Sequence, residues 1–176
     1  MDDPFRQMLR EWETFYFLAG SSSAALIGLL FVAATLGASI VIPVTAGSAH
    51  TWATPVIVHF GSALLLSAIM TVPTLTATSL GSLLGLAAIA DLAYLALTGF
   101  RLWRQNPIEP VESWDWIWNV IVPAVSHLLV LGTAIGLLAN TSQNLNPLAL
   151  AVALLIAVGI RNTWDLTLWM SQQRRN

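Results

Sequence analysis

Cysteine and lysine are both absent from this sequence, and charged residues make up only 9% of its 176 residues. Without cysteine the chain has no disulfide, no thiolate nucleophile and no cysteine-ligated iron–sulfur cluster. Without lysine it cannot form the Schiff base that retinal and pyridoxal phosphate require. A soluble domain carries about 25% charged residues. The low charge, together with 56% hydrophobic residues, therefore indicates an integral membrane protein.

The sequence also lacks the motifs that mark common soluble activities. It contains no P-loop, dinucleotide fingerprint, zincin motif or EF-hand. The formal net charge is only -2 and no basic run occurs, so nothing points to a nucleic-acid partner. We therefore expect a non-enzymatic protein whose first partner is the lipid bilayer.

Five apolar segments are long enough to cross a bilayer, which requires roughly 20 apolar residues. They cover residues 15–41, 53–73, 79–100, 117–139 and 147–170. We therefore predict an all-α protein with a five-span transmembrane domain over residues 15–170 and a tail over residues 171–176.

The N-terminal segment has the pattern of an amphipathic helix. Asp3 can cap a helix that has Pro4 at its first position. Apolar residues then recur on one helical face, namely Phe5, Met8, Leu9, Trp12 and Phe15. The sequence predicts a short interfacial helix over residues 1–14, ahead of the first span.

Arginine is distributed unequally between the two sides of the predicted bundle. Five spans put the termini on opposite sides, and four arginines lie on the C-terminal side against two on the N-terminal side. Because cytoplasmic loops carry an excess of basic residues, we expect the C-terminus in the cytoplasm and the N-terminus outside. Seven of the eight tryptophans also lie at or near the C-terminal side, as in an aromatic belt.

A weak internal repeat relates the middle of the chain to its end. Pro55-Val-Ile-Val-His59 in the second span matches Pro123-Ala-Val-Ser-His127 in the fourth, 68 residues later. The third and fifth spans align with a two-residue slip. A parallel repeat of helix pairs 2–3 and 4–5 would place the two histidines at similar depth.

The strongest functional signal is a set of polar side chains inside the apolar segments. Because such groups are costly in lipid, they mark a pathway, a ligand site or a structural ion pair. The candidates for a pore or proton pathway are His59, Asp91, Asn119, His127, Arg161 and Asp165. Arg161 and Asp165 are four residues apart and share a helix face. An ion-pair cluster of these two with Asp91 would only join helices, whereas a charged constriction or proton relay would conduct.

The two intramembrane histidines admit three interpretations. A neutral imidazole can hydrogen-bond between helices. A histidine can also act as a gate, because its charge changes near physiological pH. Finally, His59 and His127 can be axial ligands of a haem b, or can bind a metal ion of unknown identity together with Asp91 or Asp165.

Small residues form stripes on three spans. Gly20, Ala24 and Gly28 are spaced by four, and two further pairs follow at Gly81/Gly85 and Gly132/Gly136. Such stripes let helices approach closely, within or between subunits. Because they exceed what one small bundle requires, we expect a homo-oligomer.

Two segments, residues 19–33 and 159–166, resemble the first and last spans of an uncharacterised family of small bacterial multi-span inner-membrane proteins. The Arg161-Asn162-x-Trp164 stretch is the most distinctive part of this resemblance. The resemblance implies a fold and a location in the bacterial inner membrane, and it implies no activity.

Three functions are compatible with these features. The leading hypothesis is a small channel or transporter for a proton or inorganic ion, which needs no cofactor. The alternative is a haem- or quinone-binding redox anchor with His59 and His127 as axial ligands. The third is a non-conducting accessory protein that binds a partner through its tryptophan-rich rim.

Overall fold

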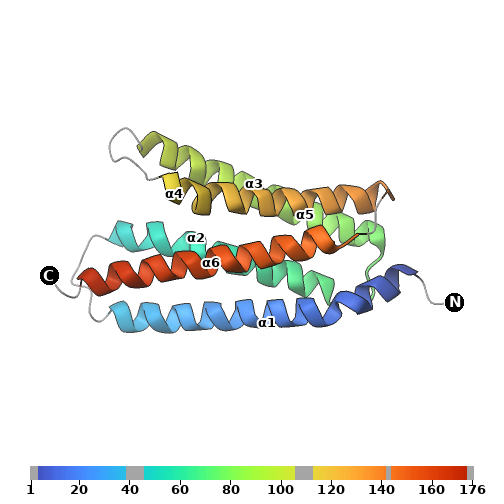
Figure 1. Ribbon diagram of the computed structural model, residues 1–176, viewed down its shortest axis with the longest axis horizontal. Coiled ribbons are helices and arrows are strands. Elements are labelled where there is room, and N and C mark those ends of the chain that lie inside the picture. Colours follow the sequence, from blue (N-terminus) through green and yellow to red (C-terminus); the bar gives the residue numbers. More distant parts are fainter. Residues whose placement is uncertain (1–3, 39–45, 106–112, 142–143, 174–176) are drawn as a thin grey trace.

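The computed structural model describes residues 4–38, 46–105, 113–141 and 144–173, and within these ranges the chain forms helices and no strand (Figure 1). The elements are α1 Pro4–Ala38, α2 Ala46–Met70, α3 Ala77–Gln105, α4 Ser113–Trp116, a π-helix η1 Ile117–Ile121, α5 Val122–Leu138 and α6 Asn146–Gln173. Helices α4, η1 and α5 follow one another without a break.

Four of the described helices are long and apolar enough to cross a membrane. The apolar stretches are Pro4–Ala33, Ala77–Arg101, Ile117–Leu138 and Asn146–Asp165. Helix α2 adds a shorter apolar stretch at Val56–Met70. Their length and hydropathy make the chain a multi-pass helical membrane protein in contact with lipid.

The predicted division between an interfacial helix and a first span is wrong. Residues 4–38 form one continuous helix, α1. No proline or glycine interrupts the chain between Phe5 and Ala19, so nothing ends the helix near residue 14. The predicted apolar face exists, but Phe5 and Leu9 are buried in the core of the bundle, where they continue the face of Tyr16. The N-terminal turns are therefore part of the bundle.

The helices pack in an order that differs from their order along the chain. Helix α3 packs against α5, α5 against α6, α6 against α2, and α2 against α1. Helices α2 and α3 are consecutive yet make few contacts with each other. Successive long helices run in opposite directions, and α1 begins at the end of the bundle opposite to the end of α6 (Figure 1).

Local hydrogen bonds define the turn between α2 and α3. Pro73 lacks an N–H and cannot continue α2. The next helix starts with reciprocal capping, in which the Ser79 N–H donates to Thr76 Oγ1 at 3.2 Å and the Thr76 N–H donates to Ser79 Oγ at 2.9 Å. At the end of α5, Asn140 adopts a left-handed conformation with φ 53°, which ends the helix.

Glycines allow two of the closest helix contacts. A Cβ at Gly159 of α6 would lie 2.5 Å from Cε1 of Phe60 on α2. A Cβ at Gly81 of α3 would lie 2.9 Å from Cγ of Leu138 on α5. Gly28 and Gly132 instead have open space around them. The small-residue stripes are thus used only in part inside the monomer.

Candidate functional site

Two histidines from different helices are buried in the bundle. His59 lies on α2 and His127 on α5, and each exposes only 2% of its surface. The two rings are close enough to interact electrostatically. Asp91 on α3 lies beside His127, with its Oδ2 3.5 Å from His127 Nδ1. We call His59, His127 and Asp91 the inner cluster.

The inner cluster is incompletely hydrogen-bonded. Neither nitrogen of His59 has a hydrogen-bond partner in the part of the chain that the structure describes. His127 Nδ1 is within ion-pair distance of Asp91 but without hydrogen-bond geometry. A buried polar group without a partner costs about 1–3 kcal/mol. Such groups are few in native proteins and call for a specific explanation, such as bound water or a functional role.

Unpartnered hydroxyls continue from the inner cluster toward the end of the bundle where α1 begins. Tyr16, Ser23 and Ser67 all have a buried oxygen that lacks a hydrogen-bond partner within the described ranges. Ser67 lies eight residues after His59 on α2, about 12 Å along the helix. Gly20 of α1 packs against it, since a Cβ there would lie 3.0 Å from Ser67 Cβ. The interface of α1 and α2 is thus polar at several depths.

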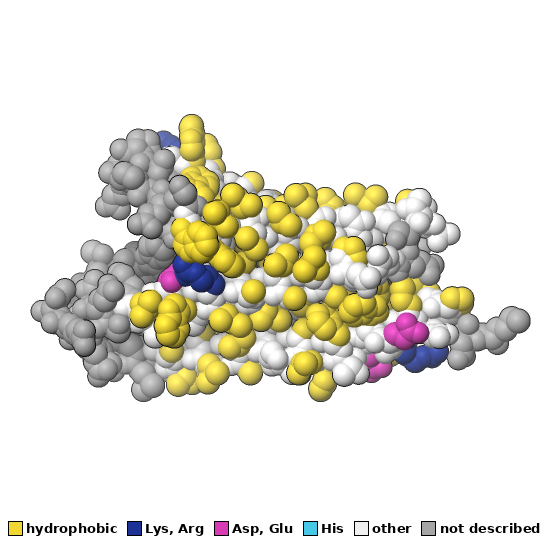
Figure 2. Space-filling model, viewed as in Figure 1, with side chains coloured by type: hydrophobic (Ala, Val, Ile, Leu, Met, Phe, Trp, Pro, Cys, Tyr) yellow, Lys and Arg dark blue, Asp and Glu magenta, His cyan; other side chains and the backbone are white. Residues whose placement is uncertain are grey.

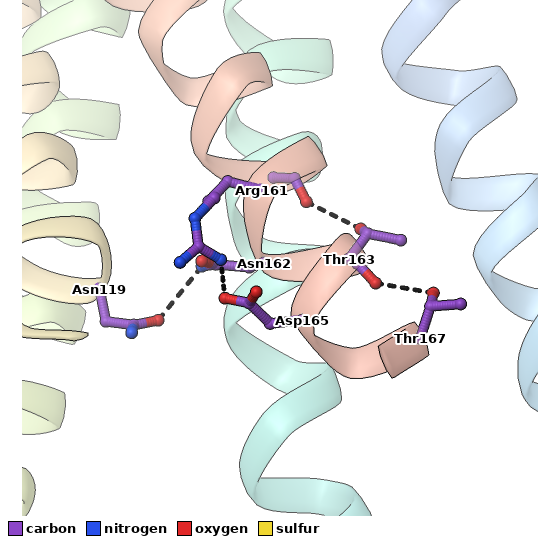
Figure 3. A network of polar contacts seen from close by, with 7 residues as sticks. Asn119, Arg161, Asn162, Thr163, Asp165 and Thr167 are labelled. Carbon is purple, nitrogen blue, oxygen red and sulfur yellow. Dashed lines mark hydrogen bonds and ion pairs between the residues drawn. The ribbon is translucent and has the colours of Figure 1, made fainter. Parts of the chain in front are cut away.

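Proline explains the local geometry at the start of α5. Pro123 has no N–H, so the α-helical hydrogen bond to the carbonyl of Asn119 is lost. The chain accommodates this with the π-helix η1, in which the Val122 N–H donates to the carbonyl of Ile117, five residues earlier. Figure 3 shows that the Asn119 side chain, which belongs to this π-helix, points toward Asn162 on α6.

A second polar group lies between η1 and α6. Asn162 Nδ2 donates to Asn119 Oδ1 at 3.2 Å, and the Arg161 guanidinium donates to the Asp165 carboxylate (Figure 3). The guanidinium also lies 6.0 Å from the centre of the Trp118 ring. The side chains of Arg161 and Asp165 are 28% and 48% exposed. We call Trp118, Asn119, Arg161, Asn162 and Asp165 the outer cluster.

The six predicted site residues therefore fall into two groups. The predicted ion-pair cluster of Asp91 with Arg161 and Asp165 does not form, because Asp91 meets His127 whereas Arg161 meets Asp165 on its own helix. Several participants were not predicted, namely Tyr16, Ser23, Ser67, Trp118 and Asn162. Of these residues, only Asn162 could have been found from the sequence, because it is a polar residue next to Arg161 within a predicted span.

The surroundings of the histidines bear on the predicted ligands. One hollow of about 510 Å³ lies between α3 and α5, and another of about 240 Å³ lies beside the start of α6. Neither His59 nor His127 lines either of them. A haem between two axial histidines needs a flat cavity that both rings line, and neither hollow has this geometry. Among the described residues, no three His, Asp or Glu side chains group as metal ligands.

Comparison with protein families, with characterised proteins and with solved structures finds no match for this chain. The length and hydropathy of its helices, together with their packing into one bundle, identify it as a multi-span helical membrane protein.

Proposed function

We propose that this protein conducts protons across the membrane, with Asp91, His127 and His59 as an internal relay. The observation that carries the proposal is the unpartnered, buried His59 beside the His127–Asp91 pair. An imidazole can accept a proton on one nitrogen and release one from the other. A ring whose two nitrogens are both free can do this without first breaking a structural hydrogen bond.

The arrangement of other polar groups supports a path in both directions from the inner cluster. Toward the end where α1 begins, buried hydroxyls follow at Ser23, Ser67 and Tyr16. Toward the opposite end, Asn119 lies eight residues, about two turns, before His127. It accepts a hydrogen bond from Asn162, the neighbour of Arg161 in the Arg161–Asp165 pair. Since the His59 nitrogens have no hydrogen-bond partner among the described residues, proton transfer between groups requires bridging water.

The same proposal includes the number of spans, the internal repeat and the oligomeric state. Five spans follow if α2, which covers Ala46–Met70, crosses the membrane along its whole length. The predicted parallel repeat is supported by the packing of α3 on α5 and of α2 on α6, since a two-fold relation of the two helix pairs exchanges these contacts. The open space at Gly28 and Gly132 supports a homo-oligomer.

The proposed membrane is a bacterial inner membrane, with the N-terminus outside and the C-terminus in the cytoplasm. The excess of arginine and tryptophan on the C-terminal side supports this orientation. The resemblance of residues 19–33 and 159–166 to an uncharacterised family of small bacterial inner-membrane proteins supports the location.

The test is proton flux in proteoliposomes that contain a pH-sensitive dye, driven by a potassium diffusion potential. We expect Asp91→Asn and His127→Ala each to reduce the flux at least tenfold, and His59→Ala to do the same. Ser126→Ala is the matched control, because Ser126 is a buried neighbour of His127 whose hydroxyl only donates to the carbonyl of Val122. Flux that survives both Asp91→Asn and His127→Ala unchanged would refute the proposal.

An absorption spectrum separates this proposal from the redox anchor. Protein purified from cells with an adequate haem supply should show only the 280 nm band, whether oxidised or reduced with dithionite. A Soret band that disappears in His59→Ala or His127→Ala would instead assign the histidines to a haem. Quinone recovered from the purified protein by solvent extraction would also point to a redox anchor.

A further inference from the structure

We propose that the Arg161–Asp165 pair binds the headgroup of a zwitterionic phospholipid that carries a primary ammonium, as phosphatidylethanolamine does. In this site the guanidinium of Arg161 takes the lipid phosphate and the carboxylate of Asp165 takes the ammonium. The inference rests on the surface of α6 and stands independently of proton conduction.

The pair lies at the depth of the headgroups. From Asn146, where α6 begins, to Asp165 the helix has 20 residues and rises about 30 Å, the thickness of the hydrocarbon core. Asp165 therefore lies at the boundary, with Arg161 one turn inside it. An arginine at this depth extends its head toward the interface. Trp164, which is 62% exposed, lies at the same level, where indole rings are favoured.

Both charged groups retain hydrogen-bonding capacity. Among the described residues, the guanidinium donates only to Asp165, and the carboxylate accepts only from Arg161. A guanidinium has five N–H donors and a carboxylate has two oxygens. A phosphate and an ammonium can therefore bind beside the existing ion pair without replacing it. Because the pair carries no net charge, a headgroup with both signs complements it better than an anionic one.

The surface around the pair suits acyl chains. Ile160 and Leu168 lie on the same side of α6 and are 52% and 45% exposed. Figure 2 shows hydrophobic side chains along the whole length of the described surface in this view, with few charged groups among them. A charged pair on such a face is in contact with lipid, so a lipid is the occupant that the geometry favours over a soluble ligand.

The experiment is native mass spectrometry of the full-length protein in detergent, titrated with three phospholipids of identical acyl chains. We expect phosphatidylethanolamine to bind about tenfold more tightly than phosphatidylglycerol, which lacks the ammonium, and than phosphatidylcholine, whose ammonium has no N–H to donate. Asp165→Asn should abolish the preference over phosphatidylglycerol, whereas Arg161→Gln should weaken the binding of all three lipids. Arg161→Lys keeps the charge and should retain the preference.

Two controls make the outcome decisive. Arg104→Gln removes an exposed arginine at the end of α3, on the same side of the membrane, and should leave the preference intact. Soluble glycerophosphoethanolamine at the same concentration should not displace the lipid. The proposal would be overturned by equal affinity for the three lipids, or by displacement of the lipid by the soluble headgroup. It would also be overturned if Asp165→Asn kept both the lipid preference and the wild-type melting temperature, or if a second copy of the chain cross-linked through residue 164.

Discussion

The histidines of the inner cluster and the ion pair of the outer cluster differ in their burial and in their hydrogen bonding. His59 and His127 are each 2% exposed, and His59 has no hydrogen-bond partner in the described structure. Arg161 and Asp165 are 28% and 48% exposed and bind each other. An exposed, paired charge costs little, whereas a buried, unpaired polar group reduces stability. The unpartnered His59 is therefore a cost to stability that calls for a specific explanation, whereas the Arg161–Asp165 pair is a partly exposed surface pair that calls for none.

The largest expected effect is a change in the free energy of unfolding that has opposite signs at the two histidines. His127→Leu leaves the Asp91 carboxylate without its partner and should lower the free energy of unfolding by about 2–3 kcal/mol. His59→Leu removes a buried group that has no partner and should leave this free energy unchanged or raise it, by up to about 2 kcal/mol. Equilibrium unfolding in mixed micelles with dodecyl sulfate measures both values. Equal losses in the two variants would contradict the distinction.

The next effect concerns the packing that positions the inner cluster. Gly159→Ala places a Cβ against the Phe60 ring, next to His59, and should cost about 1–3 kcal/mol of unfolding free energy by overpacking. Gly132→Ala is the matched control, because nothing lies within 4 Å of the added carbon. The control should be neutral or slightly stabilising in monomeric protein. Phe60→Leu, added to Gly159→Ala, should restore part of the lost stability. A cost of Gly132→Ala as large as that of Gly159→Ala would argue against this account.

A smaller effect is expected where the outer cluster joins two helices. The Asn119–Asn162 hydrogen bond links η1 to α6. A double-mutant cycle with Asn119→Ala and Asn162→Ala should yield a coupling of about 0.6 kcal/mol, the average for interhelical hydrogen bonds in membranes. A coupling of zero would mean that the two amides find other partners and do not join the helices.

The smallest effect on stability is expected at the exposed ion pair. Asp165→Asn should change the free energy of unfolding by no more than about 1 kcal/mol, because the pair is partly solvated and lies on one helix. The same substitution should change lipid preference strongly. A loss of stability as large as that in His127→Leu would place Asp165 in the structural core and remove the contrast between the clusters.

The helices of this protein are predictable to a large extent from the sequence, because hydropathy and the residues that start or end a helix are local properties. The expected spans at 79–100, 117–139 and 147–170 agree within a few residues with the apolar stretches of α3, η1–α5 and α6. The apolar face of residues 5–15 was also predictable, because it depends only on helical periodicity. That this face packs into the bundle was not predictable, because its burial depends on α2 and α6.

By itself the sequence determined that the chain is helical, apolar and membrane-spanning, and which polar residues it places at membrane depth. Only the tertiary structure decided which of these residues meet. Asp91 meets His127 because α3 packs on α5, and Arg161 is left to Asp165 because their shared face of α6 points outward. The physical reason is that hydropathy specifies how much of a helix is buried, whereas the choice of partner depends on side-chain packing between segments far apart in the chain.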